Sequence, residues 1–502
     1  MENNIVRVKL WNQEVGLLYW DATLHRAVFE YNPAFVRAGV DIAPLSASIY
    51  SAAGRLPIKG STDKIYQGLP PFIADSLPDK WGNRVFEYWT KTQGIKSSDI
   101  TPVDKLSFIA NRGMGALQFE PAIHIQEDQY DISVQELYHL AQRLFDERAE
   151  VSVMPEESIT MQRLYAVGTS AGGQHPKAVL AINSITGEIR SGQLDWPQEF
   201  RYYILKFAEN TDFPHTQVEM AYYRMAVDMG INMMPCQLME IDGQQHFLTE
   251  RYDRQNGQRI HTQTLAAMSE AACSYEDLME VARRLKVPLI QQEQLFKRMV
   301  MNVFGGNVDD HSKNFSFMLP KGGCWQITPA YDITFTVDVS AMNYANYHSF
   351  SVRGKVTKIR EEDLLAFAKD NSIKNAVSII DNVAIILSQC WTYLVDAGVN
   401  RYWADRIEAY VAELLPERYR EKMLHHVPTQ IKEYVTEQGC RMQDIVLRET
   451  RNGELMLSAV VDGVEKRALV TRKSADYLGI LQKGGIHLSE SELISYAIAY
   501  LL

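Results

Sequence analysis

The sequence contains few cysteines, and nothing in their spacing pairs them. Five cysteines lie at positions 236, 273, 324, 390 and 440 of a 502-residue chain, and no two form a CxxC pair. This scatter excludes a disulfide framework and the ligand spacing of common zinc sites. We therefore expect reduced thiols that pack as small apolar residues.

Long apolar runs are missing as well. No uncharged apolar stretch reaches the length of a membrane span, and the first residues, MENNIVRVKLWNQEVG, are polar where a signal peptide needs an apolar core. Biased tracts are absent too, and 46% hydrophobic with 23% charged residues is typical of a folded chain. These absences predict a cytoplasmic protein without a membrane partner.

Positive charge is in short supply. Lysine and arginine number 51 against 62 acidic residues, which gives a formal net charge of −11. Phosphate backbones repel such a chain, so contact with nucleic acid needs a local basic patch or a basic partner. The composition therefore disfavours a protein that binds DNA by itself.

At 502 residues the chain is too long for one ordinary core. Composition and periodicity predict an N-terminal mainly-β accessory domain over 1–125, a sheet-rich lobe over 126–253, a helical lobe over 254–440 and an appended small domain over 441–502. A sheet-rich lobe followed by a helical lobe is the outline of a bilobed, protein-kinase-like α+β fold.

Local patterns support these divisions. Apolar residues at helical spacing predict an amphipathic helix over 134–148, and the segments AVLAIN, YYILKFA, QLMEI and HFLTERY read as strands. Asp242-Gly243 joins the last two strands as a tight hairpin turn. Near the C-terminus, Asn452-Gly453 and Asp462-Gly463 separate three strand-like segments, which predicts a three-stranded meander followed by helices to Leu502.

The strongest chemical signal is NVDDHSKN at 307–314, followed by PAYDIT at 329–334. Asp309 and Asn314 have the DxxxxN spacing of a kinase catalytic loop, where the carboxylate orients a hydroxyl and the amide holds a metal. Asp332 would supply a second metal ligand. An Asp- and Asn-rich surface turn explains the same letters equally well.

Other segments offer groups for a nucleotide. Lys206, in the strand YYILKFA, matches the need for a strand lysine that contacts phosphates. In SAGGQHPK, Gly172 and Gly173 precede Lys177 and let main-chain N–H groups approach phosphate, although the spacing is not that of a P-loop. A solvated strand lysine and a structural turn remain the alternatives.

The segment LTERYDR lies where a kinase hinge joins the two lobes. Main-chain groups around Leu248, Thr249 and Glu250 are therefore candidates to receive an adenine edge.

In their order along the chain, VGTSAGGQHPK, the strand lysine, TERYDR, GNVDDHSKN and PAYDIT closely resemble the HipA-type toxin serine/threonine kinases. The N-terminal segments LPDKWGN and GMGALQFEP resemble the accessory domain of that family. The resemblance spans about 5–425 and implies ATP and Mg²⁺ as cofactors. It also implies site roles, with Asp309 as catalytic base, Asn314 and Asp332 on Mg²⁺, Lys206 on the ATP phosphates, and His311 and Lys313 against the nucleotide.

Ser170 in the GTSAGG segment matches the autophosphorylated serine of the family. The resemblance implies that its modification ejects the loop and stops ATP binding. A phosphate there brings close to two negative charges to a loop that must itself cradle phosphates, so the inhibition has a physical cause.

The sequence departs from the family pattern in the helix after the lysine strand. The family usually places an acidic residue immediately before a tyrosine pair, whereas Ala221 precedes Tyr222 here and Glu219 lies two positions earlier. The sequence leaves open whether Glu219 pairs with Lys206.

The resemblance implies a toxin kinase that phosphorylates an aminoacyl-tRNA synthetase, and a helix-turn-helix antitoxin of the HipB type that would carry the DNA contact. The residues themselves give no substrate signature. Two alternatives stay open: a catalytically silent nucleotide-binding co-repressor partner of the antitoxin, and an atypical small-molecule or lipid kinase.

Overall fold

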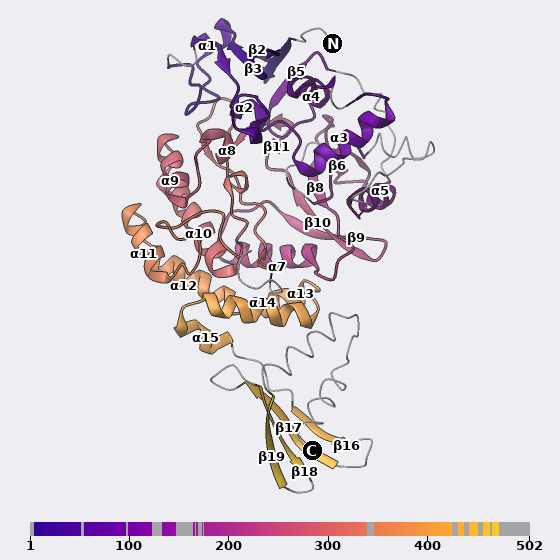
Figure 1. Ribbon diagram of the computed structural model, residues 1–502, viewed down its shortest axis with the longest axis vertical. Coiled ribbons are helices and arrows are strands. Elements are labelled where there is room, and N and C mark those ends of the chain that lie inside the picture. The colour runs from indigo at the N-terminus through magenta and orange to yellow at the C-terminus, as the bar shows by residue number, and fades with distance from the viewer. Residues whose placement is uncertain are drawn as a thin grey trace. The chain divides into compact units, whose positions relative to one another are not determined.

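A computed structural model describes residues 5–51, 55–96, 99–122, 133–146, 164–165, 167–168, 173, 175–338, 346–423, 430–435, 441–449, 455–461 and 464–470. The chain divides into two compact units, Met1–Arg420 and Glu421–Leu502. The first unit holds an N-terminal sheet, a second five-stranded sheet and a helical lobe (Figure 1).

The N-terminal domain is built on a five-stranded sheet in the order β4-β3-β2-β1-β5. Alternating residues of its strands form an apolar core with the neighbouring helices. Its elements are β1 (Val6–Leu10), β2 (Gln13–Asp21), β3 (Arg26–Tyr31), α1 (Pro33–Ala38), β4 (Ile58–Lys59), the short turn η2 (Lys64–Tyr66), α2 (Pro71–Ala74), α3 (Lys80–Thr92), α4 (Pro102–Ile109) and β5 (Leu117–Glu120).

The second sheet has the strand order β7-β6-β8-β10-β9, and all its ladders are antiparallel. The elements are α5 (Val134–Asp146), β6 (Lys177–Asn183), β7 (Ile189–Ser191), β8 (Phe200–Lys206), α7 (His215–Asp228), β9 (Cys236–Ile241) and β10 (Gln244–Glu250). Apolar residues of α3 and α5 share one buried cluster with one face of this sheet, while α7 packs against β9 and β10 (Figure 1).

The helical lobe follows two short hairpin strands, β11 (Arg254–Gln255) and β12 (Gln258–Arg259). Its central helix α10 packs against α9, α12 and α14. The elements are β13 (His261–Thr264), α8 (Leu265–Met268), α9 (Tyr275–Arg284), α10 (Leu289–Gly305), the turn η5 (Ser312–Asn314), β14 (Ser316–Leu319), β15 (Gln326–Ile327), α11 (Glu361–Asp370), α12 (Ala376–Leu387), α13 (Cys390–Asp396), α14 (Arg401–Leu414) and α15 (Glu417–Met423).

The second unit contains a four-stranded antiparallel sheet in sequence order. The three strands expected there are β17 (Arg441–Glu449), β18 (Leu455–Val461) and β19 (Val464–Val470), and a further strand, β16 (Gln430–Val435), precedes them. The unit therefore begins about twenty residues before the expected boundary at 441. The helices predicted after the meander lie outside the described residues.

The predicted α+β, kinase-like bilobed class is confirmed by this architecture. The hairpin at Asp242-Gly243 also forms as predicted: both residues have positive φ, 52° and 72°, as a type I′ turn requires. The helix α3 belongs to the N-terminal domain, but it packs Trp81 and Trp89 into the core of the second sheet.

Among the helices of the described part of the chain, none is by itself long and apolar enough to cross a membrane. The bent pair α12 and α13 passes that test together, by length and composition only.

Leu205 tests whether the cluster under the second sheet is the main source of its stability. The side chain is 0% exposed, so Leu205→Ala should lower the free energy of unfolding by about 2–5 kcal/mol through lost burial and a cavity. The control is Ile185→Ala, whose side chain is 79% exposed. Urea unfolding measures both variants. An equal, small effect of the two would contradict this assignment of the core.

Candidate active site

Lys206 ends strand β8, and its ammonium group lies between two carboxylates from distant parts of the chain. Its Nζ donates to Glu219 Oε1 of α7 at 2.6 Å and also contacts Asp332 Oδ1. The pairing with Glu219, which the sequence left open, is therefore present. Ala221, the residue directly before the tyrosine pair, is fully buried in the helix interface instead.

Lys206, Glu219 and Asp332 shift one another's pKa values. Burial alone would lower the pKa of Lys206, but Asp332 and Glu219 raise it above its ordinary value. Burial would raise the pKa of Asp332, but Lys206 and Lys177 hold it at about 2. For Glu219 burial prevails, and its pKa rises despite Lys206. Lys206 and Asp332 therefore stay ionised at neutral pH.

Lys177 stands directly across the strand pair from Lys206, so both side chains emerge on the same face of the sheet. Lys177 is only 3% exposed. Burial lowers the pKa of its ammonium to about 8, with Lys206 adding to the effect and Asp332 opposing it. Gly173 has a φ of +109°, and a Cβ there would come within 2.4 Å of Lys177 Nζ. The positive φ favours glycine at this position, and a Cβ there would force the end of the Lys177 side chain to shift.

The segment after α10 brings Asp309 and Asn314 into one turn. Asn314 Nδ2 donates to the Asp309 carbonyl oxygen at 2.7 Å, and the Asp309 N–H donates to Thr336 Oγ1 at 3.1 Å. His311 Nε2 lies 3.8 Å from Asp309 Oδ1. Burial raises the pKa of Asp309. His311 opposes this rise, and the negative charge of Asp332 adds to it. A raised pKa suits a carboxylate that accepts a proton.

Asp310, which the sequence analysis passed over, anchors this turn. Its carboxylate is fully buried and accepts from Tyr275 Oη at 2.7 Å and from the Ser349 and Phe350 N–H groups at 2.9 and 3.3 Å. His348 Nδ1 lies 2.9 Å from the same carboxylate. The two adjacent aspartates thus have opposite surroundings. The only sequence signal was the doubled Asp itself, because the partners lie 35 to 40 residues away.

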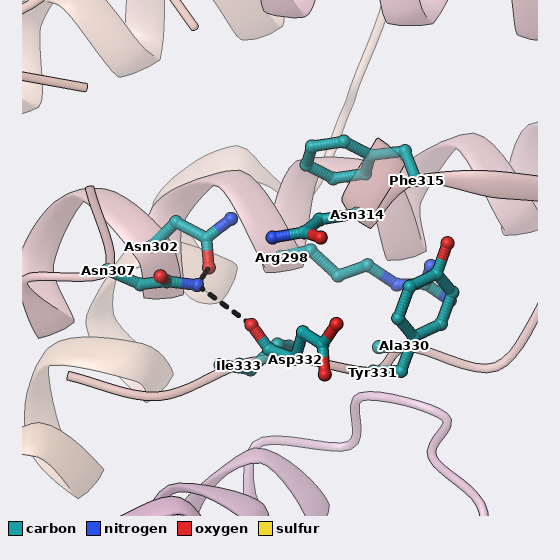
Figure 2. A pocket seen from close by; sticks show the side chains of 9 residues that line it. All are labelled: Arg298, Asn302, Asn307, Asn314, Phe315, Ala330, Tyr331, Asp332 and Ile333. Atoms are coloured by element: carbon teal, nitrogen blue, oxygen red, sulfur yellow. Dashed lines mark hydrogen bonds between the residues drawn. The ribbon is translucent and has the colours of Figure 1, made fainter. Parts of the chain in front are cut away.

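Asp332 and Asn314 line the same small pocket. Asp332 has a φ of 53°, an uncommon backbone conformation for a residue other than glycine, and Asn307 Nδ2 holds its carbonyl oxygen at 3.3 Å. Figure 2 shows this pocket, which is lined by Arg298, Asn302, Asn307, Asn314, Phe315, Ala330, Tyr331, Asp332 and Ile333. The two predicted metal ligands therefore face one space.

The other residues predicted to contact nucleotide lie in different surroundings. Lys313 Nζ contacts Asp79 Oδ1 of the N-terminal domain, and the Lys313 N–H donates to His311 Nδ1 at 3.2 Å. Ser170 and Gly172 lie outside the described residues. Whether any of these residues binds nucleotide stays a prediction.

Leu248, Thr249 and Glu250 are the last three residues of strand β10, paired with β8 on one side and, at Leu248 and Thr249, with β9 on the other. The Glu250 N–H donates to the Pro235 carbonyl oxygen at 3.0 Å. Their main-chain groups serve the sheet, so the prediction of an adenine contact gains no support from this geometry.

The rest of TERYDR ties the domains together. Asp253 is fully buried and accepts from Arg251, Arg254 and the Gly115 N–H. Arg254 donates in return to the carbonyl oxygens of Gly115 and Gly113. Burial would raise the pKa of Asp253, but the two guanidinium groups hold it well below its usual range. Asp253 and Arg254 therefore join the GMGAL segment of the N-terminal domain to the kinase-like lobes.

Together, the two lobes, the strand lysine with its helical acid, and the loop that carries Asp309, Asn314 and Asp332 define a protein-kinase-like fold. A family model described as HipA N-terminal domain matches residues 6–120, and one described as HipA-like C-terminal domain matches residues 169–391. The chain belongs to the HipA family, with a match to each of its two domains.

Known proteins agree with this assignment. The Shewanella oneidensis HipA, solved with HipB and operator DNA, superposes with a TM-score of 0.57 at 16% identity, over 83% of this chain and 96% of that chain. A Haemophilus influenzae protein named "Putative kinase" is 26% identical over 294 residues, 54% of this chain and 78% of its own length. A Sinorhizobium fredii relative, Y4mE, is 24% identical over 222 residues, 39% of this chain and 53% of its own length.

The low pKa of Lys177 predicts a specific pH dependence of stability. Below about pH 8 the Lys177 ammonium is charged both in the folded protein, where it is buried, and in the unfolded chain, where it is in water. Between about pH 8 and 10.5 only the unfolded chain keeps this proton, and above about pH 10.5 neither state does. The unfolding free energy of the wild type should therefore rise relative to Lys177→Met between these values, by a total on the order of 3 kcal/mol. Urea unfolding of both proteins at pH 7 to 10.5 measures this. A difference that does not change with pH would refute the assignment.

The variants Asp310→Asn and Asp309→Asn together test whether Asp310 anchors the turn. Asp310→Asn should lower the unfolding free energy by about 1–3 kcal/mol, because an amide leaves buried donors without an acceptor. Asp309→Asn, at a side chain 53% exposed, should change it by about 0.5 kcal/mol or less. Equal losses in the two variants would show that Asp310 is no special anchor.

Proposed function

We propose that the protein is an ATP- and Mg²⁺-dependent serine/threonine protein kinase that acts as the toxin of a toxin–antitoxin pair. The observation that carries the proposal is the position of Lys206, whose side chain is 16% exposed, between Glu219 of α7 and Asp332 of the opposite lobe. Phosphoryl transfer requires this lysine and acid pair together with a metal-binding carboxylate.

The residues present fit the charges of a magnesium-bound nucleotide. Lys206, Lys177 and Lys313 supply ammonium groups for phosphate oxygens, and Gly173 allows close approach of the main chain. Asp332 and Asn314 offer the oxygen ligands that Mg²⁺ prefers. The described residues contain no cluster of three or more His, Cys, Asp or Glu side chains that could cage a metal. That composition fits an ion whose remaining ligands are phosphate and water.

Each side chain then has a defined task. Asp309 would orient the substrate hydroxyl and accept its proton on a carboxylate oxygen, for which its raised pKa is suited. Magnesium, when bound, would neutralise the charge that develops on the phosphate oxygens. Asn314 holds the Asp309 carbonyl and Asn307 holds that of Asp332, so the acceptor and metal ligands are positioned before substrate arrives.

The resemblance to the HipA family supports a proposal for the substrate and the partner. We propose an aminoacyl-tRNA synthetase as substrate, Ser170 as the site of autophosphorylation, and a helix-turn-helix antitoxin of the HipB type as partner. The net charge of −11 supports a division of labour in which the antitoxin contacts DNA and this chain does so only indirectly. ATP and such a substrate are both cytoplasmic, which is the compartment we propose.

Asp309→Asn tests the proposed base. Purified protein incubated with Mg²⁺ and γ-labelled ATP should transfer label to itself at Ser170 and to aminoacyl-tRNA synthetases, as read by mass spectrometry. The variant should lose about 10²–10⁴-fold of this rate. Asp212→Asn, an exposed aspartate of the same unit, serves as control. Nucleotide binding by the wild type without any transfer would instead favour the silent co-repressor.

A further inference from the structure

Asp79 occupies an unusual position for a residue that begins a helix. It is the N-cap of α3, and aspartate at an N-cap ordinarily accepts a hydrogen bond from the first turn of its own helix. Here the side chain makes no such bond. Its carboxylate reaches instead to two other segments, which come from the two lobes on either side of the candidate active site.

The two partners are groups that an anion requires. Asp79 Oδ2 accepts the N–H of Gly173 at 2.9 Å, and Asp79 Oδ1 contacts the ammonium of Lys313. Trp81, two residues on, brackets the same glycine: its N–H lies 3.3 Å from the Gly173 carbonyl oxygen, and its indole Nε1 donates to the Lys177 carbonyl oxygen at 3.0 Å. The start of α3 is thus held to Gly173 by two hydrogen bonds and to the Lys177 carbonyl by a third.

A main-chain N–H beside an ammonium group is also what a phosphate oxygen requires. Both partners of Asp79 belong to the set proposed to hold the nucleotide. A carboxylate and a phosphate cannot share these donors, because two negative charges at hydrogen-bond distance from the same groups repel each other. Phosphate that binds Lys313 and the Gly173 N–H must therefore displace Asp79.

We propose that Asp79 competes with nucleotide phosphate for the Gly173 amide and the Lys313 ammonium, so that the N-terminal domain sets the affinity of the site for phosphate. This inference rests on the proposed function, since it assumes that nucleotide enters here. Once displaced, the Asp79 carboxylate has a second set of partners in the N–H groups of the first turn of α3, which are its ordinary partners as an N-cap.

Asp79→Asn isolates the charge from the cap. Asparagine is as good an N-cap as aspartate, so α3 keeps its terminus, but the ion pair with Lys313 is lost. Asp63→Asn is the matched control: Asp63 also caps a short helix in the N-terminal domain, through the Ile65 N–H at 3.0 Å. Equal melting temperatures of the two variants establish that folding is intact. Asp79→Ser, which also retains a capping oxygen without charge, provides a second variant.

Isothermal titration calorimetry of full-length protein with Mg²⁺-ATP and with adenosine reads the competition directly. Asp79→Asn should bind Mg²⁺-ATP about two- to tenfold more tightly than wild type and Asp63→Asn, because a partly exposed ion pair no longer opposes it. Affinity for adenosine, which has no phosphate, should not change. The gain should shrink as salt is raised, since salt screens the contact between Asp79 and Lys313.

Two other outcomes have distinct meanings. If Asp79→Asn and Asp79→Ser bind Mg²⁺-ATP as wild type does or more weakly, the inference is overturned and Asp79 only holds Gly173 in place. If wild type and every variant bind no nucleotide at all, the proposed kinase function fails, independently of Asp79.

Discussion

The partly buried ammonium of Lys206 is the constraint around which the rest of the first unit is organised. A lysine removed from water is costly unless opposite charges surround it, so its strand requires carboxylates at close range. One comes from α7, which packs on the same sheet, and the other from Asp332 in the opposite lobe. The unusual backbone of Asp332 and the support that Asn307 gives it both serve to bring that carboxylate to the lysine.

The N-terminal domain is a structural part of this site rather than an attachment to it. Its helix α3 contributes Trp81 and Trp89 to the core beneath the second sheet. Asp253 and Arg254 fasten the Gly113 and Gly115 segment through fully buried charges, whose removal on one side would leave the other unpaired. The same domain places Asp79 between the two lobes. The N-terminal domain therefore contacts the candidate site directly.

The sequence predicted what depends on local pattern, and it failed where long-range geometry decides. The Asp242-Gly243 hairpin and the helix α5 need only their own residues. Glu219 was ambiguous because its pairing depends on how α7 is rotated: Glu219 and Tyr222, three residues apart, share the buried face of that helix, and the letters alone do not give that rotation. Asp310 could not be separated from Asp309, since its partners arrive from α9 and from residues 348–350.

In the proposed function, the charge balance of the site lets residues that do not touch the nucleotide affect its affinity. Lys177, Lys206 and Lys313 face the carboxylates of Glu219, Asp332 and Asp79, so the cations are already partnered within the protein. An incoming phosphate must exchange these partners, and the free energy of binding is the difference between new and old contacts. A strongly held carboxylate therefore weakens binding, and a loosely held one yields. The contact of Lys313 with Asp79, whose side chains are 43% and 23% exposed, is easier to exchange than that of Lys206 with Glu219, at 16% and 11%, because water screens it more.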